Sequence, residues 1–275
     1  MGLVRLRKGR SIGVFGRAMI VRSARGWYAL FECQRETEPK SPTGRRVGLD
    51  RGITTFAATS DGDRLRHPRL ANRNQAHVAR LARVVARRRR GGANRRKAVR
   101  MLAKAHDRLR WARRDFLHKL SRSIINGYDF VAIEALKVRN MMRSAKGTTQ
   151  QPGSNVRAKS RLNFAIADAS WTLFASMLHA KAEEAGRTVF EVDPRYTSQT
   201  CAGCGLVDAA SRISQAEFIC TNCGLQLDAD VNAAKVILKR AELAACGEGH
   251  RVAGPQRSTK CTSAGADPVH AASAA

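Results

Sequence analysis

The segment "YDFVAIEAL", residues 128–136, decides the fold class. Its apolar residues from Phe130 to Ile133 follow one another without a polar interruption. Such a short continuous run is typical of a strand that is buried on both faces of a sheet. The run stops at Glu134, so the strand is expected to end in a carboxylate.

The segments around this run alternate between strand and helix patterns. Residues 46–62 predict a strand, a return strand and a turn into a third strand, because Gly52 divides two apolar or β-branched runs. Residues 162–186 carry apolar positions at helical spacing on one face and predict one amphipathic helix, closed by Gly186. A strand over 187–193 follows. Strands that alternate with crossover helices indicate an α/β domain with one mixed sheet.

Two further segments complete the order of elements. Residues 18–34 alternate apolar and polar positions about Arg25-Gly26, which predicts a β-hairpin. Residues 230–245 predict a last helix with Val231, Ala234 and Ile237 turned inward.

The composition describes a globular chain with a large positive charge. Of 275 residues 43% are hydrophobic, and 50 Lys and Arg stand against 22 acids, for a formal net charge of +28. Such a field attracts nucleic acid or an anionic membrane surface. No apolar run of about 18 residues occurs, and the N-terminus has neither a secretory signal nor a myristoylation pattern. We therefore expect a soluble intracellular protein with a polyanionic partner and no membrane association.

Residues 64–122 hold 21 Lys and Arg but only two acids, Asp107 and Asp115. Apolar residues recur there at helical spacing and "GGAN" at 91–94 interrupts them once, which predicts two basic helices folded back on each other. A solvated helix face is the ordinary explanation of a short charge run. Here the excess is almost uncompensated over several turns, so the hairpin is expected to contact phosphates. The candidate contact residues are Arg87, Arg88, Arg89, Arg90, Arg95, Arg96, Lys97, Arg113 and Arg114.

Four of the seven cysteines form two C-x-x-C pairs, Cys201 with Cys204 and Cys220 with Cys223. A glycine follows each pair and permits the tight turn that directs two thiolates at one ion. This spacing predicts a closed tetrahedral Zn²⁺ site, which stabilises structure and leaves no open position for chemistry. Buried free cysteines or a redox pair are the alternative explanation. The remaining cysteines, which are expected to take no part, are Cys33, Cys246 and Cys261.

Three acidic residues stand at the ends of predicted elements. Asp50 and Glu134 each end an apolar strand and Asp230 begins the last helix, so all three are expected to converge at one end of the sheet. Carboxylates gathered in this way repel one another unless divalent cations neutralise them. Hard oxygen ligands suit Mg²⁺ or Mn²⁺, and paired ions promote in-line phosphodiester cleavage. Taken singly, an acid at a strand end is more often a cap or a surface ion pair.

Several segments together resemble one protein family. In order they are "VGLDRGITTFAATSDG" (47–62), "YDFVAIEALKVRNMM" (128–142), "VDPRYTSQTCAGCG" (192–205) and "DADVNAA" (228–234). They are similar to the segmented RuvC nuclease core and zinc ribbon of the TnpB (OrfB) proteins of bacterial insertion sequences, RNA-guided relatives of type V CRISPR effectors. The basic run "RRDFLHKLSRSII" (113–125) resembles the helical insertion of the same family.

The resemblance implies an RNase H-like fold and a function. The family's catalytic acids correspond to Asp50, Glu134 and Asp230, with Asp228 as a nearby rival for the third place. The implied reaction is Mg²⁺- or Mn²⁺-dependent hydrolysis of DNA by water. A guide RNA would supply specificity by base pairing, while the protein contacts a short flanking DNA motif. The expected location is the bacterial cytoplasm, in association with the nucleoid.

The resemblance also implies a division of the chain. Residues 1–45 are expected to be a remnant of a wedge-like β domain, and 46–193 a RuvC-like core with a helical insertion over about 70–126. Residues 194–227 are the expected zinc ribbon and 228–245 the last helix of the core. The small, polar tail over 246–275 is expected to be disordered.

One departure from the family pattern leaves two readings open. Family members carry a longer N-terminal region with a recognition lobe, whereas only about 45 residues precede the core here, so the chain is a truncated copy or its start is placed too late. In the first reading the core cuts single-stranded DNA and guided duplex cleavage is weak or absent. In the second the chain is a non-cleaving guide-RNA or DNA binder. Both readings predict salt-sensitive binding, but only the first predicts cleavage.

Overall fold

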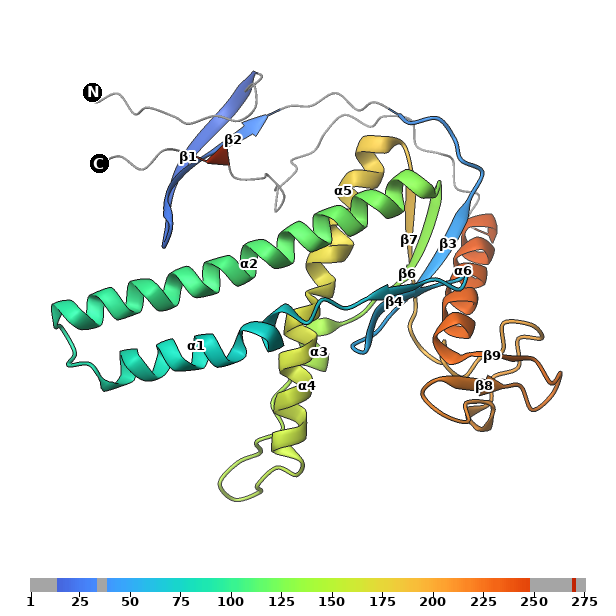
Figure 1. Cartoon of the computed structure of the whole chain (residues 1–275). Coiled ribbons are helices and arrows are strands. Elements are labelled where there is room, and N and C mark those ends of the chain that lie inside the picture. Colours follow the sequence, from blue (N-terminus) through green and yellow to red (C-terminus); the bar gives the residue numbers. More distant parts are fainter. Residues whose placement is uncertain (1–13, 34–38, 248–268, 271–275) are drawn as a thin grey trace. The chain divides into compact units, whose positions relative to one another are not determined.

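The computed structural model describes residues 14–33, 39–247 and 269–270 (Figure 1). The chain divides into two units. The first takes its described residues from 1–37, 69–118 and 258–275, and the second takes them from 38–68 and 119–257. Almost all of the tail for which disorder was expected, 246–275, lies outside the described residues.

The second unit is built on a five-stranded mixed sheet in the order β5-β4-β3-β6-β7. Its strands are β3 (Arg46–Arg51), β4 (Thr55–Thr59), β5 (Arg64–Arg66), β6 (Phe130–Glu134) and β7 (Thr188–Val192). Strands β3, β6 and β7 run parallel, and β4 pairs antiparallel with both β3 and β5. The prediction of one mixed sheet is confirmed, with the opening segment as the strand β6 between two parallel neighbours.

Helices cover both faces of this sheet (Figure 1). Ala132 and Val192 pack against Ile237 and Ala241 of α6 (Ala229–Gly247) on one face. Because side chains alternate along a strand, Leu49 and Ile133 point to the opposite face, where they are fully buried. Helix α5 (Trp171–Ala185) lies on that second face. The continuous apolar run of β6 therefore supplies residues to both layers of the core.

Gly48 allows α6 to approach β3 closely. A Cβ atom at this position would lie 2.1 Å from the backbone oxygen of Ala234 and 2.9 Å from the backbone nitrogen of Leu238. No other residue type fits without a shift of the helix, because real Cβ atoms do not come so near backbone atoms. The start of α6 is consequently held against the same face of β3 to which Asp50 belongs.

The expectation of a single helix over 162–186 is wrong. Two helices, α4 (Val156–Ala169) and α5, meet at Ser170, which adopts a left-handed backbone conformation with φ of 52°. The break shifts the phase of the apolar stripe, so Phe164 is 42% exposed instead of buried with Phe174. The glycine cap is confirmed, since Gly186 has φ of 64° and closes α5. A short helix α3 (Val138–Met141) follows β6.

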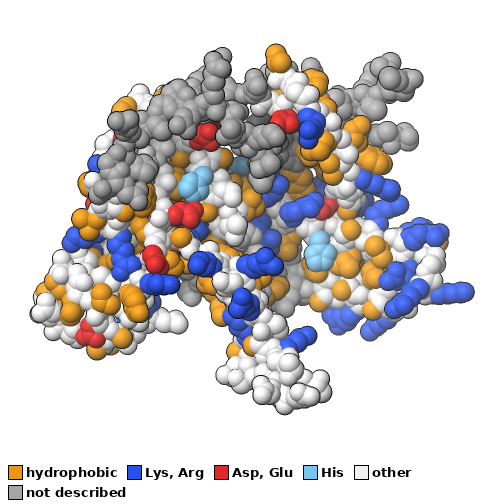
Figure 2. Space-filling view, turned by 180° about the vertical axis from the view of Figure 1, so that it is seen from behind, with side chains coloured by type: hydrophobic (Ala, Val, Ile, Leu, Met, Phe, Trp, Pro, Cys, Tyr) orange, Lys and Arg blue, Asp and Glu red, His pale blue; other side chains and the backbone are white. Residues whose placement is uncertain are grey.

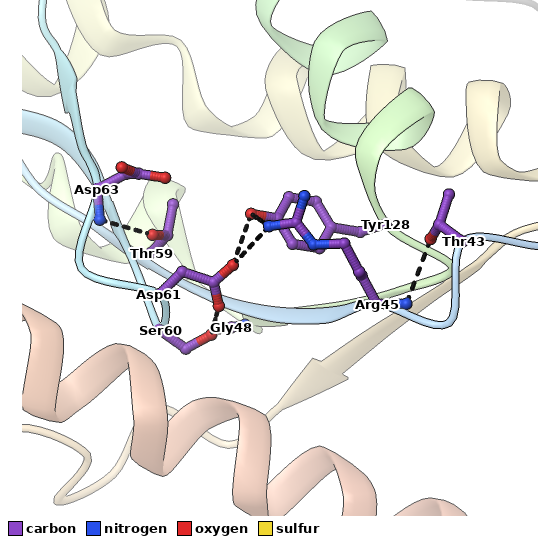
Figure 3. Close-up of polar contacts among 8 residues, drawn as sticks. All are labelled: Thr43, Arg45, Gly48, Thr59, Ser60, Asp61, Asp63 and Tyr128. Carbon is purple, nitrogen blue, oxygen red and sulfur yellow. Dashed lines mark hydrogen bonds and ion pairs between the residues drawn. The ribbon is translucent and has the colours of Figure 1, made fainter.

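A polar network fixes the first residues of β3 to the turn between α2 and β6 (Figure 3). The guanidinium of Arg45 donates to Asp61 at 3.0 Å and stacks over the Tyr128 ring, 4.5 Å from its centroid. The Tyr128 hydroxyl donates to the same carboxylate at 2.9 Å. Burial and the bond to Asp61 raise the pKa of Tyr128. These contacts lie at the end of β3 opposite Asp50, and we assign them a structural role.

The first unit combines a β-hairpin with a helical hairpin. Strands β1 (Phe15–Ser23) and β2 (Gly26–Cys33) pair antiparallel, as predicted, but Ala24 and Arg25 form the two-residue turn, one residue earlier than the predicted Arg25-Gly26. The short strand β10 (Val269–His270) adds to β2. Helices α1 (Leu70–Arg87) and α2 (Ala93–Gly127) form the predicted basic pair, and the last turns of α2 belong to the second unit. Ser23 donates to Asp107 of α2 at 2.6 Å and Tyr28 contacts Trp111, so the two hairpins pack together.

Candidate functional site

Asp50 and Glu134 stand side by side on neighbouring parallel strands. Leu49 of β3 is the register partner of Ile133 of β6, so the next residue on each strand is an acid. By alternation both carboxylates face α6. Asp230 lies in the first turn of α6, so the packing of this helix on β3 brings the third acid to the same end of the sheet. The predicted convergence is present in the structure.

Asp50 is at the electrostatic centre of this acid cluster. Burial, which has the largest effect, and the charges of Glu134 and Asp230 together raise the pKa of Asp50 to about 7, although the charges of Arg212 and Arg51 lower it. Among the described residues its carboxylate has no hydrogen-bond or ion-pair partner. Burial also raises the pKa values of Glu134 and Asp230. The charge of each of these two acids raises the pKa of Asp50, but neither raises the pKa of the other.

Glu134 is the most firmly held of the three acids. The Thr197 hydroxyl donates to its Oε1 at 2.7 Å, which lowers the pKa that burial raises. The buried Arg51 guanidinium, on the opposite face of the sheet, donates to the Glu134 backbone oxygen. Side chain and backbone of Glu134 are thus fixed from two sides.

The structure separates Asp228 from Asp230. Asp228 ends β9 (Gln226–Asp228), and its Oδ1 accepts from the backbone nitrogens of Asp230 and Val231, both at 3.1 Å. It therefore caps the N-terminus of α6. Its Oδ2 forms an ion pair with Arg64. Asp230 makes neither contact and acts electrostatically on Asp50, so the geometry favours Asp230 as the third member of the cluster.

Arg212 is a site residue that the sequence did not reveal. It follows the short helix η1 (Ala209–Ser211) between the two cysteine pairs, and its guanidinium lies 3.9 Å from Asp230 Oδ1. Its charge lowers the pKa values of both Asp50 and Asp230. Nothing in the local pattern distinguishes it from the chain's many other arginines, because only the folding of the cysteine module turns it toward the acids.

The four paired cysteines form one tight cluster. Their sulfur atoms all lie within 4.8 Å of one another, with Cys201 and Cys220 buried and Cys204 and Cys223 exposed. Backbone hydrogen bonding from Leu206 helps to lower the pKa of Cys204 to about 6. Among the described residues this is the one group of Cys, His and acidic side chains close enough to hold a metal ion. The three carboxylates interact at longer range.

Helix α6 holds the first cysteine turn directly. Asn232 is fully buried, accepts from the backbone nitrogen of Ala202 at 2.9 Å and donates to the backbone oxygen of Thr200 at 2.8 Å. Lys239 donates to the backbone oxygens of Ala202 and Gly203. Since Asn232 lies two residues after Asp230, the cysteine module and the acid cluster share a rigid connection.

The candidate nucleic-acid contacts lie in the α1–α2 hairpin, where Figure 2 shows many Lys and Arg side chains on the surface. Arg87 ends α1, Arg88 to Arg90 lie in the connection, and all four are exposed. Arg96 and Lys97 are exposed in α2, whereas Arg95, Arg113 and Arg114 are half-buried. Cys33 and Cys246 are free and exposed, outside the cysteine cluster, and Cys261 lies beyond the described residues. In the part of the chain that the structure covers, every helix is too short or too polar to cross a bilayer.

Comparisons with known proteins find similar sequences over most of this chain. Residues 30–145 match the model of the OrfB_IS605 family, described as probable transposase, and residues 171–237 match the TNB domain of Cas12f1-like proteins. The "Putative RNA-guided DNA endonuclease InsQ" of Escherichia coli (strain K12) is 38% identical over 251 residues, 90% of this chain and 62% of the relative. The chain belongs to the TnpB (OrfB) family. A second relative, from Streptomyces pristinaespiralis and also named "Putative RNA-guided DNA endonuclease", is 36% identical over 86% of this chain and 54% of its own length.

This TnpB-family chain thus spans less than two thirds of the length of both relatives. Among solved structures, a Cas12f1 complex with single guide RNA and target DNA gives a TM-score of 0.46 at 17% identity, covering 80% of this chain and 55% of that one. A Cas12f ternary complex gives 0.47 at 20% identity, over 77% of this chain and 41% of that one.

Proposed function

We propose that this chain is the nuclease core of an RNA-guided DNA endonuclease, with Asp50, Glu134 and Asp230 as its catalytic acids. The observation that carries the proposal is the half-buried carboxylate of Asp50, which has no hydrogen-bond or ion-pair partner in the described part of the chain and whose pKa is raised by desolvation and by the charges of Glu134 and Asp230. A protein interior does not keep such a group charged without compensation. The names of the relatives support the same reading.

Divalent cations fit this donor set. Carboxylate oxygens are the ligands that Mg²⁺ and Mn²⁺ prefer, and Asp50, Glu134 and Asp230 would hold such ions if their carboxylates approached one another more closely than they do in this structure. When bound, such ions activate water and stabilise the leaving oxygen of a phosphodiester. Thr197 orients Glu134, and Arg212 provides a positive charge beside Asp230 for a substrate phosphate.

The cysteine cluster is proposed to hold a structural Zn²⁺ ion. Four thiolates fill a tetrahedral coordination sphere, so the ion has no open position for catalysis. In this proposal residues 194–227 are a zinc ribbon inserted before α6, within a RuvC-like core that spans 46–193 and 228–245. The exposed arginines of the α1–α2 hairpin would contact the phosphates of DNA and guide RNA in the bacterial cytoplasm.

A cleavage assay tests the proposal. The purified chain, with zinc retained, is incubated with labelled single-stranded DNA and Mg²⁺ or Mn²⁺, beside an Asp50→Ala variant. Metal-dependent cutting that is lost in the variant is expected. Equal cutting by both proteins would reject Asp50 as catalytic.

A non-cleaving nucleic-acid binder is the second candidate, because the exposed arginines at the connection of α1 and α2 would account for binding without any use of the acids. It predicts the same salt-sensitive binding with no cutting by either protein. Guided duplex cleavage is expected to be weak or absent, and a guide-dependent double-strand product would overturn that expectation.

A further inference from the structure

Tyr196 stands next to the acid cluster in an unusual backbone conformation. Its φ is 59°, in the left-handed region that bulky side chains rarely adopt. Its backbone oxygen accepts from the backbone nitrogens of Gln199 and Thr200, both at 3.0 Å, and from the Thr200 hydroxyl at 2.7 Å. The loop therefore holds a strained tyrosine in place where glycine or asparagine would fit without strain.

This strain does not serve to bury the ring. Tyr196 is 61% exposed, and its side chain makes no hydrogen bond or ring contact with the described residues. The neighbouring residue, Thr197, donates to Glu134, so the ring emerges one residue from a contact to the cluster, and consecutive Cα atoms are about 3.8 Å apart. An exposed aromatic side chain that projects from a backbone held beside a site is suited to binding a flat group.

The charged residues beside Tyr196 indicate which kind of molecule the ring would bind. The side chain of Arg195 is 80% exposed. Arg240 donates to the backbone oxygens of Asp193 and Arg195 and so stiffens the loop. The Arg195 guanidinium forms an exposed ion pair with Asp193 at 3.8 Å, which leaves most of its surface open to solvent. An exposed aromatic ring with an exposed guanidinium next to it suits an unpaired nucleobase and its phosphate, because any base presents a π-face for stacking.

We propose that Tyr196 is a stacking platform for an unpaired base of the DNA strand that enters the acid cluster. This inference rests on the proposed nuclease function and adds a substrate contact to it. The ring would position the strand without regard to sequence, because stacking tolerates all four bases. Tyr196 is thus a substrate-binding residue, and it takes no part in proton transfer.

The test uses the full chain with Asp50→Asn, so that the strand is bound but not cut, and a short single-stranded DNA in which one base at a time is 2-aminopurine. Stacking on an aromatic ring quenches the fluorescence of this base. At one position we expect quenching that Tyr196→Phe preserves and Tyr196→Leu removes, with about five-fold or greater loss of affinity in the leucine variant. Ile213→Ala, at a 60% exposed apolar residue of the cysteine module, is the matched control and should behave as the parent.

Tyr196→Gly separates binding from folding. Glycine relieves the left-handed strain, so its unfolding temperature should equal or exceed that of the parent while quenching is lost. Quenching and affinity in the leucine and glycine variants that equal those of the parent, or no quenching at any position, would overturn the stacking inference. Cutting of single-stranded DNA by the chain with Asp50 intact reports on the proposed function separately, since it can persist when Tyr196 proves irrelevant.

Discussion

At the scale of single residues, the site depends on a few acidic side chains whose surroundings disfavour the negative charge that they ordinarily carry at neutral pH. Asp50 is the clearest case, because burial and two neighbouring acids raise its pKa to about 7. Glu134 is stabilised by the Thr197 hydroxyl, and Asp230 by the nearby guanidinium of Arg212. Asp50 alone lacks a direct partner among the described residues, so it determines how the cluster responds to pH and to cations.

Replacing Asp50 by Asn should change the pH dependence of stability. The folded protein keeps the Asp50 proton up to about pH 7, whereas the unfolded chain loses it near 3.8, so the parent loses stability as pH rises through this window. The penalty reaches at most about 4 kcal/mol at pH 8. Without Mg²⁺ or Mn²⁺, Asp50→Asn should unfold at a higher temperature than the parent at pH 8, with a smaller gain at pH 5.

Thermal unfolding in buffers that retain zinc measures this difference. Asp63→Asn, at an exposed aspartate, is the control and should follow the parent at both pH values. Addition of Mg²⁺ at pH 8 should stabilise the parent more than Asp50→Asn. A gain independent of pH would show that charge at Asp50 is not the cause.

Asn232 should be essential for stability. Asn232→Ala removes one buried and one partly buried hydrogen bond, and it leaves the Thr200 oxygen and the Ala202 nitrogen without this partner. The expected loss in the free energy of unfolding is about 2–4 kcal/mol, measured by urea denaturation. Asn126→Ala, at an exposed residue that accepts from Lys40 alone within the described part of the chain, should cost about 0.5 kcal/mol or less. Similar losses in both variants would contradict the role of Asn232.

At the scale of elements, α6 joins the two chemical centres. Its first turn carries Asp230, its next residues hold the first cysteine turn, and its packing on β3 requires Gly48. The second cysteine turn leads through β9 to the cap at Asp228. The position of α6 is therefore coupled to the cysteine module at both ends of that module.

Cys223→Ser should lower nuclease activity without touching an acid. Loss of one of four thiolates weakens metal binding, which loosens the module and the start of α6. We expect less than one zinc per chain by metal analysis and at least about ten-fold slower cleavage of single-stranded DNA. Cys246→Ser, at a free cysteine outside the cluster, should retain both zinc and activity. Full activity in a zinc-free Cys223→Ser protein would show that the two centres are independent.

At the scale of the whole molecule, we expect the net charge of +28 to govern the proposed encounter with nucleic acid. Arg87 to Arg90 form an exposed block at the connection of α1 and α2, and half-buried members such as Arg113 are less accessible. Electrostatic contacts of this kind do not read sequence, so they contribute affinity and salt dependence.

Replacing Arg87, Arg88, Arg89 and Arg90 by Gln should flatten the salt dependence of single-stranded DNA binding. Each lost phosphate contact reduces the slope of log affinity against log salt by about 0.7, so four contacts reduce it by about 3. The slope is obtained from fluorescence anisotropy titrations between low and moderate salt. The matched Arg→Lys replacement keeps the charge and should keep the slope. An unchanged slope in the Gln variant would exclude this block as a contact surface.

The sequence by itself determined the elements and the candidate acids, because these depend on local patterns. The apolar run from Phe130 to Ile133 predicts its own burial, the C-x-x-C pairs predict their cluster, and Asp50 and Glu134 are marked by the strands they end. The helix break at Ser170 was not predicted, because no glycine or proline stands at this position to indicate its left-handed backbone.

Only the tertiary structure decided how distant segments meet. Asp228 and Asp230 are two residues apart and of the same type. Their roles differ only because Asp228 caps α6, whereas the charge of Asp230 acts on Asp50. Arg212 and Tyr196 gain their roles from the folding of the cysteine module and of the loop after β7, which no local period encodes. Positions fixed by short-range periodicity can be read from a chain, whereas positions fixed by packing between separate elements require the fold.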